Sequence, residues 1–421
     1  MSDSRRAALP PWFRPPPPAA FPGHALIIGA GIAGAATAAA LIRRGWRVTV
    51  AERHGHVAAG ASGNPAGIHM PRIVAGCSPE RDFHAAAFRH GIAELARLGQ
   101  AVTRQACGVL QLCAGERQVR QRDAALRSGF LPPDMMRPVG PAEASELAGI
   151  PIAGTPIDCQ SLWFPQGGWI EPGSLCRALL AGAEVRTGIA VTALRHDGKL
   201  WHAHDSLEPA DAVILANGID ARMFEQSAWL PLSPRRGQIS MVRASERSSR
   251  QRCVVSHDGY IIRATSGEHV IGATFDHVED VIPANRQYAV AADDARNLAQ
   301  LETRFPGLLD PDCVLGGRAS LRAMTTDHLP LTGPVPLVGR FVEDFAGLRH
   351  GRLERTFGEA VCHPGLWVIA GLGARGLVTA PLAGELLAAQ ISGGPWPVGA
   401  ETAAALHPAR FLVRDLKRSK I

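Results

Sequence analysis

Apolar residues along this chain gather in short runs separated by glycine turns and alanine-rich stretches. The run His24–Ile28 predicts a buried strand, Ile32–Arg44 a helix, and Arg47–Glu52 a second strand. A similar strand, Leu366–Ala370, is followed near the C-terminus by a predicted helix over Leu377–Ile391. Strands that alternate with helices in this way predict an α/β fold with a parallel sheet.

The middle of the chain has a different pattern. An alanine-rich helical region ends near Leu98, and mixed structure follows to about Gly154. A helix is predicted over Pro172–Ala181, two strands around a Ser-Gly-Glu turn over Gly259–Phe275, and a further helix over Ala289–Phe305. We therefore expect a nucleotide-binding domain that is interrupted by a second domain rich in antiparallel sheet.

The segment "PPWFRPPPPAAFPG", Pro10–Gly23, contains seven prolines in fourteen residues. Proline fixes φ and lacks a backbone donor, so an extended tether is expected here rather than packed structure. Nowhere do about 18 apolar residues follow one another, which argues against a membrane span. Prolines also follow the arginines near the N-terminus, where a signal peptide would have an apolar core.

Composition narrows the class of protein further. The 421 residues are long enough for two domains, and 46% of them are hydrophobic. The eight cysteines show neither CxxC pairs nor zinc-ligand spacing, so we expect reduced thiols, no metal and a cytoplasmic location. The net charge of +6 permits an anionic partner such as RNA, and a solvated basic surface explains it equally well. Arg410, Arg414 and Arg418 recur every four residues near the C-terminus and are candidates for phosphate contacts.

The first glycine signature lies in "IIGAGIAGA". Gly29, Gly31 and Gly34 follow a strand and open a helix, and Glu52 ends the next strand. In this context Gly29 makes the tight turn, Gly31 lets the backbone approach a pyrophosphate, and Gly34 lets the helix pack on the strand. Glu52 is expected to accept hydrogen bonds from a ribose diol and to disfavour NADP. The pattern predicts a dinucleotide site.

A second signature, Gly371, Gly373 and Gly376, is followed by a helix but by no returning strand. A second NAD site is therefore not expected. A late strand-turn-helix can instead direct its free N–H groups at the reduced flavin ring of a ligand held by the first unit. A single adenosine-binding unit then favours permanently bound FAD over transiently bound NAD. The alternative interpretation of Gly371–Gly376 is a plain tight turn.

These residues resemble the D-amino-acid-oxidase-like FAD superfamily, which includes glycine oxidase and sarcosine oxidase. "GASGNPAG" (Gly60–Gly67), "AVILANGID" (Ala212–Asp220) and "RRGQIS" (Arg235–Ser240) carry the likeness. The resemblance implies a Rossmann-type FAD-binding domain with an inserted antiparallel-sheet substrate domain. It implies the following FAD-binding residues: Gly29, Gly31, Ile32, Ala33, Gly34, Glu52, Arg53, Ala61, Ser62, Gly63, Asn64, Gly67, Val191, Ala216, Asn217, Gly218, Gly371, Gly373, Ala374, Arg375, Gly376 and Leu377.

A narrower resemblance is carried by "RAMTTDHLPLTGPVP", "GLGARGLVTAPLAGELLA" and "LHPARFLVRDLKR". These stretches are similar to the FAD domain of the bifunctional bacterial enzymes that make 5-methylaminomethyl-2-thiouridine at the tRNA wobble position. The likeness implies oxidation of the carboxymethylaminomethyl group of wobble uridine, with release of glyoxylate. In those enzymes a proline-rich tether follows a methyltransferase domain. Either this chain is a stand-alone oxidase half with a separate methyltransferase, or it is a truncated form.

The substrate implied by this resemblance carries a glycine unit, whose carboxylate needs a cation, best the fork of an arginine. Arg318 and Arg322, four apart on a predicted strand, and Arg375 in the last glycine turn are the candidates. His69 stands where relatives often have an aromatic residue and is a further candidate, although an isolated histidine is more often packed or solvated. A glycine- or sarcosine-oxidase-like enzyme acting on small amines is the alternative, and a non-catalytic FAD protein is a third class.

The expected domains follow from these motifs. Residues 1–23 form the tether, and residues 24–90, 165–235 and 320–395 form a discontinuous FAD-binding domain. Residues 91–164 and 236–319 form the substrate domain, and residues 396–421 form a basic tail.

Overall fold

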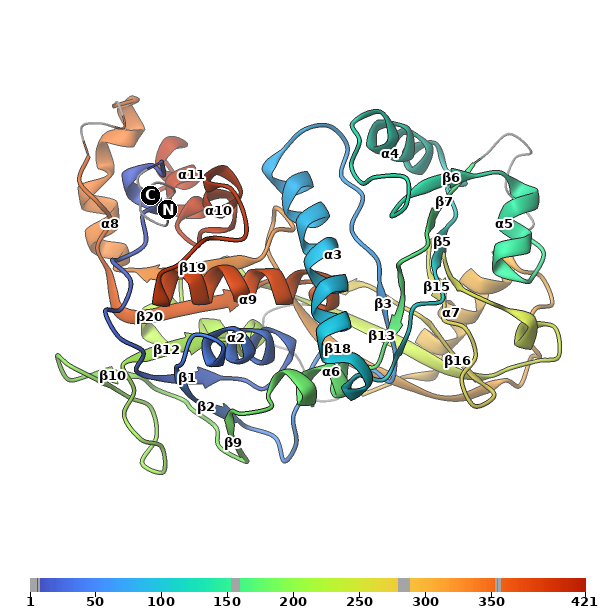
Figure 1. Cartoon of the computed structure of the whole chain (residues 1–421), viewed down its shortest axis with the longest axis horizontal. Helices are drawn as coiled ribbons and strands as arrows, with labels where there is room; N and C mark the ends of the chain where they lie inside the picture. The colour runs from blue at the N-terminus through green and yellow to red at the C-terminus, as the bar shows by residue number, and fades with distance from the viewer. Residues whose placement is uncertain (1–5, 7, 153–159, 279–287, 353, 355–356) are drawn as a thin grey trace. The chain divides into compact units, whose positions relative to one another are not determined.

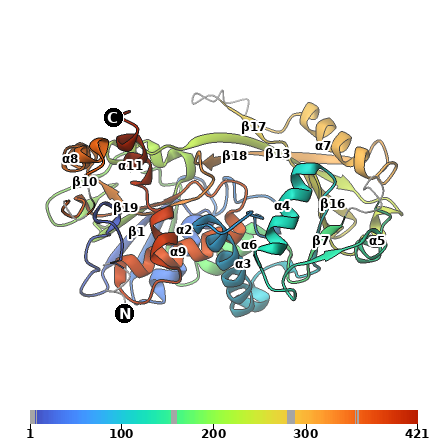
Figure 2. The same cartoon turned by 90° about the horizontal axis from the view of Figure 1, so that it is seen from above.

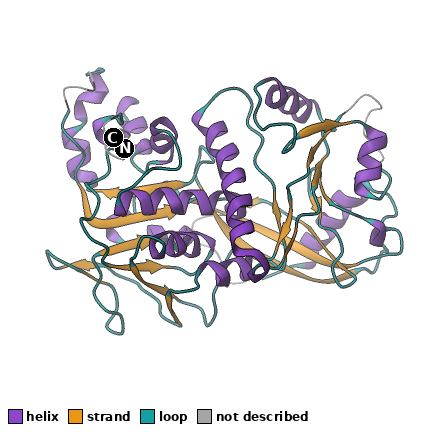
Figure 3. Ribbon diagram, viewed as in Figure 1, coloured by secondary structure: helices purple, strands orange, loops and turns teal. Residues whose placement is uncertain are grey.

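The computed structural model describes residues 6, 8–152, 160–278, 288–352, 354 and 357–421. The chain divides into two compact units, each with its own sheet and helices (Figure 3). Unit 1 consists of Met1–Ala59, Cys176–Ser233 and Ala323–Ile421, and unit 2 consists of Gly60–Leu175 and Pro234–Arg322. An interrupted first domain was predicted, but residues 60–90 and 165–175, expected in it, lie in unit 2. Part of the mixed stretch predicted before Gly154 falls outside the described residues.

Unit 1 is built on a six-stranded sheet in the order β19-β20-β12-β1-β2-β9. Five strands are parallel neighbours, and β19 runs antiparallel to β20. Their bounds are β1 His24–Ile28, β2 Arg47–Glu52, β9 Glu184–Thr187, β12 Ala212–Leu215, β19 Leu331–Pro336 and β20 Cys362–Ala370, with a small hairpin of β10 Arg195–His196 and β11 Trp201–His202. The predicted strands at both ends of the chain are thus neighbours in one sheet, because β12 lies between β1 and β20.

Helices α2 (Ile32–Ile42) and α9 (Gly376–Ser392) lie side by side in unit 1 (Figures 1 and 2). Both are rich in alanine and glycine, which lets their backbones approach closely. A Cβ on Gly384 of α9 would stand 2.9 Å from the carbonyl carbon of Ala36 in α2. The predicted helices at these positions are confirmed, with α2 ending two residues earlier than expected.

The proline-rich segment is packed, contrary to the sequence-based expectation. Pro11–Phe13 forms a turn of 3₁₀ helix, and Trp12 is 7% exposed in a cluster with Phe345 and Leu412. The prolines exclude regular structure as predicted, but the aromatic residue between them supplies apolar surface that unit 1 buries. The later part of this segment is more exposed, with Phe21 at 83%, but Ala19 N still donates a hydrogen bond to Ile391 O at 2.9 Å.

The C-terminal segment is also part of unit 1 rather than a tail. It contains α10 (Ala400–Leu406) and α11 (Arg410–Lys417), and it lies near α8 (Val338–Asp344) in the cluster around Trp12. Arg410, one of the three candidates for phosphate contacts, forms two hydrogen bonds with Asp327, at 2.7 and 2.9 Å, and is engaged within unit 1.

Unit 2 contains a nine-stranded sheet in the order β17-β13-β16-β15-β14-β5-β7-β6, with β18 also paired to β13. The sheet is mainly antiparallel, with a parallel pair of β5 and β14. Its strands are β5 Val109–Gln111, β6 Arg137–Val139, β7 Ser161–Phe164, β13 Ser233–Arg243, β14 Val254–Ser256, β15 Tyr260–Ile261, β16 Glu268–Gly272, β17 Asp276–His277 and β18 Val314–Met324. The predicted hairpin over Gly259–Phe275 is confirmed by the pairing of β15 with β16.

Helices and a second, smaller sheet complete unit 2. Helix α7 packs on β16 through a core that contains Leu301, Phe305 and Ile271. The helices are α3 Pro79–Leu98, α4 Glu116–Arg127, α5 Pro141–Ala148 and α7 Ala291–Arg304, and the chain passes to unit 1 in α6 Pro172–Leu179. The small sheet has the order β3-β8-β4, with bounds Gly67–His69, Gly168–Ile170 and Arg104–Gln105. Among the described residues, no helix combines the length and apolar character that crossing a membrane requires.

Candidate functional site

The first glycine turn, Gly29–Gly34, connects β1 to α2 at the carboxyl end of the parallel strands. Gly29 has φ +106°, and a Cβ on it would lie 2.8 Å from the carbonyl oxygen of Ala216. Gly31 is the N-cap of α2 and has no side chain to cover the free N–H groups. A Cβ on Gly34 would stand 2.0 Å from the Gly29 oxygen, so helix and turn meet only without a side chain. The turn leaves bare backbone at a helix N-terminus, as phosphate binding requires.

Glu52 lies at the end of β2 and is 7% exposed. Its Oε2 accepts a hydrogen bond from Ala30 N at 2.9 Å, and its Oε1 accepts one from His54 N at 3.0 Å. Oε1 also lies 2.7 Å from His54 Nδ1, so Oε2, which accepts from one donor, is the oxygen that keeps capacity for a hydroxyl donor. The side chain of Arg53, another residue expected to bind FAD, forms an ion pair with Asp220 at 2.7 Å. The structure therefore holds the Glu52 carboxylate in one orientation before any ligand binds.

The end of β12 lies against the first glycine turn. Ala216 N donates to Ile28 O at 3.0 Å, and the backbone of Asn217 passes 3.0 Å from the position of a Cβ on Gly29. The side-chain Oδ1 of Asn217 is buried and has no hydrogen-bond partner among the described residues. A buried acceptor without a partner is costly and indicates a donor that the chain itself does not provide. Val191, one of the residues expected to bind FAD, is buried in the core of the same unit.

The last glycine turn, Gly371–Gly376, lies next to the first one in unit 1. Gly371 has φ +72° and Gly373 has φ +56°, conformations that favour glycine. A Cβ on Gly376 would stand 3.2 Å from the Cγ2 of Ile32, the first residue of α2. The two turns are thus close enough to contact one ligand, which was the condition on which the FAD prediction depended.

Arg375 is the N-cap of α9 and is half-buried. Its carbonyl accepts a hydrogen bond from Thr379 Oγ1 at 3.0 Å. Its neighbour Ala374 is exposed, and Leu377 is half-buried. The structure keeps Arg375 in the last glycine turn, as predicted from its position in the sequence, and its contact with a substrate stays a prediction.

The segment Gly60–Gly67 belongs to unit 2, where Arg318 of β18 holds it. Arg318 Nη1 donates to Asn64 Oδ1 at 2.9 Å, and Nη2 donates to Gly60 O at 2.6 Å. Ala61 is exposed, and Ser62 and Gly63 are half-buried. The guanidinium of Arg318 is therefore engaged with the segment Gly60–Gly67 and acts as a positioning group for it, and its predicted contact with a substrate carboxylate stays a prediction.

His69 is a buried residue of β3. It is 2% exposed, its ring lies 5.2 Å from that of Phe88, and its Nε2 faces Gly91 of α3, where a Cβ would stand 2.8 Å away. Burial, with a smaller effect of Arg104, lowers the pKa of His69 to about 4. The imidazole is neutral near pH 7, and its surroundings are those of a packed side chain.

Arg322 has the environment expected of an anion-binding group. It lies on β18, and Gly237 leaves room for its guanidinium, because a Cβ there would stand 2.1 Å from Nη1. Its nearest acceptor is Thr274 O, at 3.4 Å, and no described carboxylate forms an ion pair with it. Burial lowers the pKa of Arg322 but leaves the group charged. A charge held in this way without a partner is costly unless a ligand provides one.

Sequence reasoning missed Tyr260, which lies on β15 beside Arg322. Burial raises the pKa of its hydroxyl, and the Arg322 guanidinium lowers it. A Cβ on Gly272 would stand 3.0 Å from this hydroxyl. No described residue forms a hydrogen bond with the Tyr260 hydroxyl, so a second donor accompanies the arginine. The hairpin was predicted, but no spacing in the sequence connects residue 260 with residue 322.

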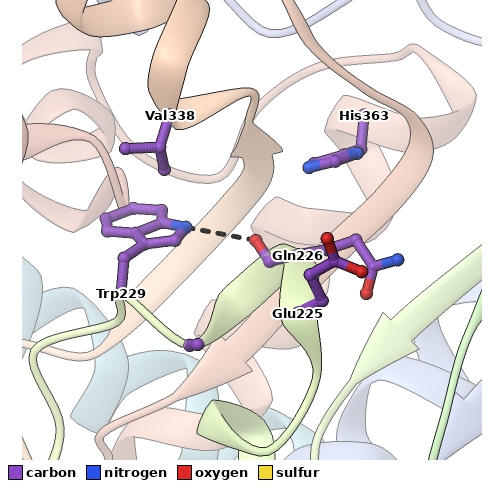
Figure 4. Close-up of a pocket in the computed structure, with 6 residues that line it drawn as sticks. Glu225, Gln226, Trp229, Val338 and His363 are labelled. Atoms are coloured by element: carbon purple, nitrogen blue, oxygen red, sulfur yellow. Dashed lines mark hydrogen bonds between the residues drawn. The ribbon is translucent and has the colours of Figure 1, made fainter.

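A separate cavity of about 420 Å³ lies on unit 1, lined by Glu225, Gln226, Ala228, Trp229, Val338 and His363 (Figure 4). The indole of Trp229 donates to the Gln226 carbonyl at 3.2 Å, which fixes the wall of the cavity. His363 lies near the start of β20, whereas the last glycine turn follows the end of this strand. None of the predicted site residues lines this cavity.

Two adjacent glycine turns, a fixed buried acid and the unpartnered Asn217 oxygen fit a dinucleotide with a second group beside it. Such a sheet with these turns defines a FAD-binding α/β oxidoreductase. The chain belongs to the family of FAD dependent oxidoreductases, whose model matches residues 24–390. FAD is its cofactor, and the contacts of Gly31, Glu52 and Asn217 with it stay predictions.

Two curated relatives match almost the whole chain. It is 38% identical over 424 residues to the tRNA 5-methylaminomethyl-2-thiouridine biosynthesis bifunctional protein MnmC of Chromobacterium violaceum, covering 98% of this chain and 63% of that protein. It is 39% identical over 430 residues to the protein of the same name in Stutzerimonas stutzeri, covering 99% and 63%. The chain therefore spans about 63% of the length of these relatives.

Solved structures share the fold. Glycine oxidase from Geobacillus kaustophilus superposes with a TM-score of 0.68 at 21% identity, covering 88% of this chain and 94% of that one. Iminodiacetate oxidase from Chelativorans sp. BNC1 gives 0.67 at 24% identity, covering 89% and 96%. The predicted fold class is confirmed.

Proposed function

We propose that this chain oxidises the carboxymethylaminomethyl group of wobble uridine 34 in tRNA. The substrate is 5-carboxymethylaminomethyl-(2-thio)uridine, and the products are the 5-aminomethyl nucleoside and glyoxylate. The proposal is supported by 38–39% identity over nearly the whole chain to relatives named for the biosynthesis of a modified wobble nucleoside.

The observation that carries the proposal is the Arg322 guanidinium, which has no carboxylate partner among the described residues. The substrate's glycine unit ends in a carboxylate, which pairs with an arginine fork through two charge-assisted hydrogen bonds. The hydroxyl of Tyr260 can donate a third. Ala323, the residue after Arg322 on the same strand, accepts a hydrogen bond from Gly373 N at 3.0 Å. By chain continuity, Arg322 directly precedes the residue that fixes the last glycine turn.

Bound FAD supplies a two-electron acceptor for oxidation of the Cα–N bond of the glycine unit to an imine. Water adds to the imine and the C–N bond breaks, which releases glyoxylate and leaves the amine on the nucleoside. The part of Arg322 is to hold the carboxylate and so orient the Cα–H bond. Arg318 keeps the segment Gly60–Gly67 in place.

The deciding experiment mixes the FAD-loaded protein without oxygen with tRNA that carries the carboxymethylaminomethyl group, and separately with glycine and sarcosine. Bleaching of the flavin by the tRNA, with glyoxylate as product, is expected. Bleaching by the small amines alone would contradict the proposal and favour a small-amine oxidase, since Arg322 serves any amino-acid carboxylate.

Substitution at Arg322 tests the assignment of the carboxylate. Arg322→Gln removes the charge and is expected to slow flavin reduction by tRNA about a hundredfold, because a charge-assisted pair is lost. FAD content should not change. Arg318→Gln, on the same strand, should lower FAD content first, because it releases Asn64 and Gly60. Equal reduction rates in Arg322→Gln and the unchanged protein would remove Arg322 from the site.

A further inference from the structure

Phe275 is an exposed aromatic residue beside Arg322, the arginine of unit 2 that has no carboxylate partner among the described residues. It lies three residues after the end of β16 and next to Thr274 in the sequence, and 47% of it is exposed. The guanidinium carbon of Arg322 lies 5.7 Å from the centroid of its ring, within the range of a cation–π contact. Phe275 therefore contacts the guanidinium and is also partly open to solvent.

An exposed phenylalanine alone means little, because single apolar side chains are common on protein surfaces. The position of Phe275 differs because the guanidinium beside it is held in place and has no carboxylate partner in the part of the chain that the structure describes. Gly237 gives the guanidinium its space, and Thr274, the residue before Phe275, offers it a carbonyl at 3.4 Å. Whatever anion Arg322 binds must bring the rest of its molecule near the Phe275 ring.

The length of the proposed substrate matches this arrangement. Four bonds of about 1.5 Å separate the carboxyl carbon of the glycine unit from C5 of the uracil ring, so an extended chain spans about 5 Å. This span is similar to the 5.7 Å between the Arg322 guanidinium and the Phe275 centroid. A carboxylate on Arg322 thus leaves the uracil within reach of the exposed aromatic face, and every nucleobase has a π-face that can stack there.

We propose that Phe275 stacks on the uracil base and makes the enzyme prefer a nucleoside-linked glycine unit to a free amino acid. This inference rests on the proposed function. Phe275 is a specificity-determining residue: a free amino acid has the carboxylate but no base, so it gains nothing from this ring. Arg322 then recognises what the two substrates share, and Phe275 recognises what separates them.

The test compares Phe275→Leu and Phe275→Trp with the FAD-loaded unchanged protein. The probes are an anticodon stem-loop carrying the carboxymethylaminomethyl uridine, followed by fluorescence anisotropy, and sarcosine, followed by anaerobic flavin reduction. Phe275→Leu should weaken stem-loop binding about ten- to hundredfold, the usual effect of losing one base–aromatic stack. Phe275→Trp should bind within about threefold of the unchanged protein, and neither change should alter FAD content. Any reduction by sarcosine should fall less in Phe275→Leu than stem-loop binding does, because sarcosine offers Arg322 a carboxylate but brings no base to the ring. Phe21→Leu, an exposed phenylalanine of unit 1, is the matched control and should change nothing.

Two results would overturn the inference. Stem-loop binding by Phe275→Leu equal to that of the unchanged protein would show that the ring makes no contact with the base. Equal weakening in Phe275→Leu and Phe275→Trp would show a steric effect in place of stacking. Failure of the proposed function is seen separately, in the unchanged protein, as flavin reduction by sarcosine but not by the modified stem-loop.

Discussion

His69 shows how burial changes the chemistry of a single side chain. Its ring packs between Phe88 and the bare backbone of Gly91, and no described residue forms a hydrogen bond with its Nε2. Removal from water penalises the charged imidazolium, and Arg104 adds a smaller repulsion. Protonation of His69 is therefore unfavourable in the folded protein, whereas in the unfolded chain the imidazole takes up a proton near pH 6.5.

The consequence is a pH-dependent stability. Because the folded pKa of His69 is lowered to about 4, its contribution to stability is fully present above pH 6.5 and is lost as pH falls toward 4. The loss amounts to about 3 kcal/mol at most. His69→Phe should remove it, so the difference in unfolding free energy between pH 7 and pH 4.5, from urea titrations, should be smaller in the variant. The same pH dependence in both proteins would contradict this assignment.

Residues whose role follows from their neighbours in the sequence could be predicted. Residues whose role depends on distant parts of the chain meeting in the fold could not. Gly29 and Gly34 follow from the turn and the helix packing that their spacing requires. Tyr260 and Phe275 join Arg322 only because β15, β16 and β18 belong to one sheet, which no motif encodes. The stacking surface therefore appears only when the strands are placed.

At the scale of elements, the contact between α2 and α9 brings the two glycine turns together. Each strand-turn-helix was predicted, because it is a local pattern. That both turns contact one ligand was also expected, but no local pattern indicates how they are brought together, which depends on β12 pairing with both β1 and β20 and on small residues where the helices touch. Gly384 is such a residue, facing the backbone of Ala36.

Gly384→Ala should loosen this contact. Its Cβ would stand 2.9 Å from backbone atoms of Ala36 and Thr37, which cannot rotate away, so we expect a loss of about 1–3 kcal/mol in unfolding free energy and weaker retention of FAD. Gly339→Ala in α8 meets no atom within 4 Å and should be neutral or slightly stabilising. Thermal unfolding and the absorbance of retained flavin after dialysis measure both effects. Retention of FAD by Gly384→Ala at the level of Gly339→Ala would show that the helices tolerate separation.

At the scale of the molecule, an interrupted domain could be predicted from the strand-helix units at both ends of the chain. The packing of the N-terminal segment could not. Proline content indicates what the backbone cannot form, but it does not show where an aromatic side chain finds a partner. Trp12 is buried by Phe345 and by Leu412, residues more than 300 positions away in the chain.

Trp12→Ala tests whether this segment stabilises unit 1. The indole packs edge-on to Phe345 at a centroid distance of 6.0 Å and lies 5.8 Å from Lys417 Nζ, so truncation leaves a cavity among α8 and α11. We expect a loss of about 3 kcal/mol in unfolding free energy. Phe21→Ala in the same segment, with 83% of its side chain in solvent, should cost less than 0.5 kcal/mol. Urea titrations followed by release of the flavin report on unit 1, and equal midpoints for the two variants would mean that the N-terminal segment only lies on the surface without stabilising it.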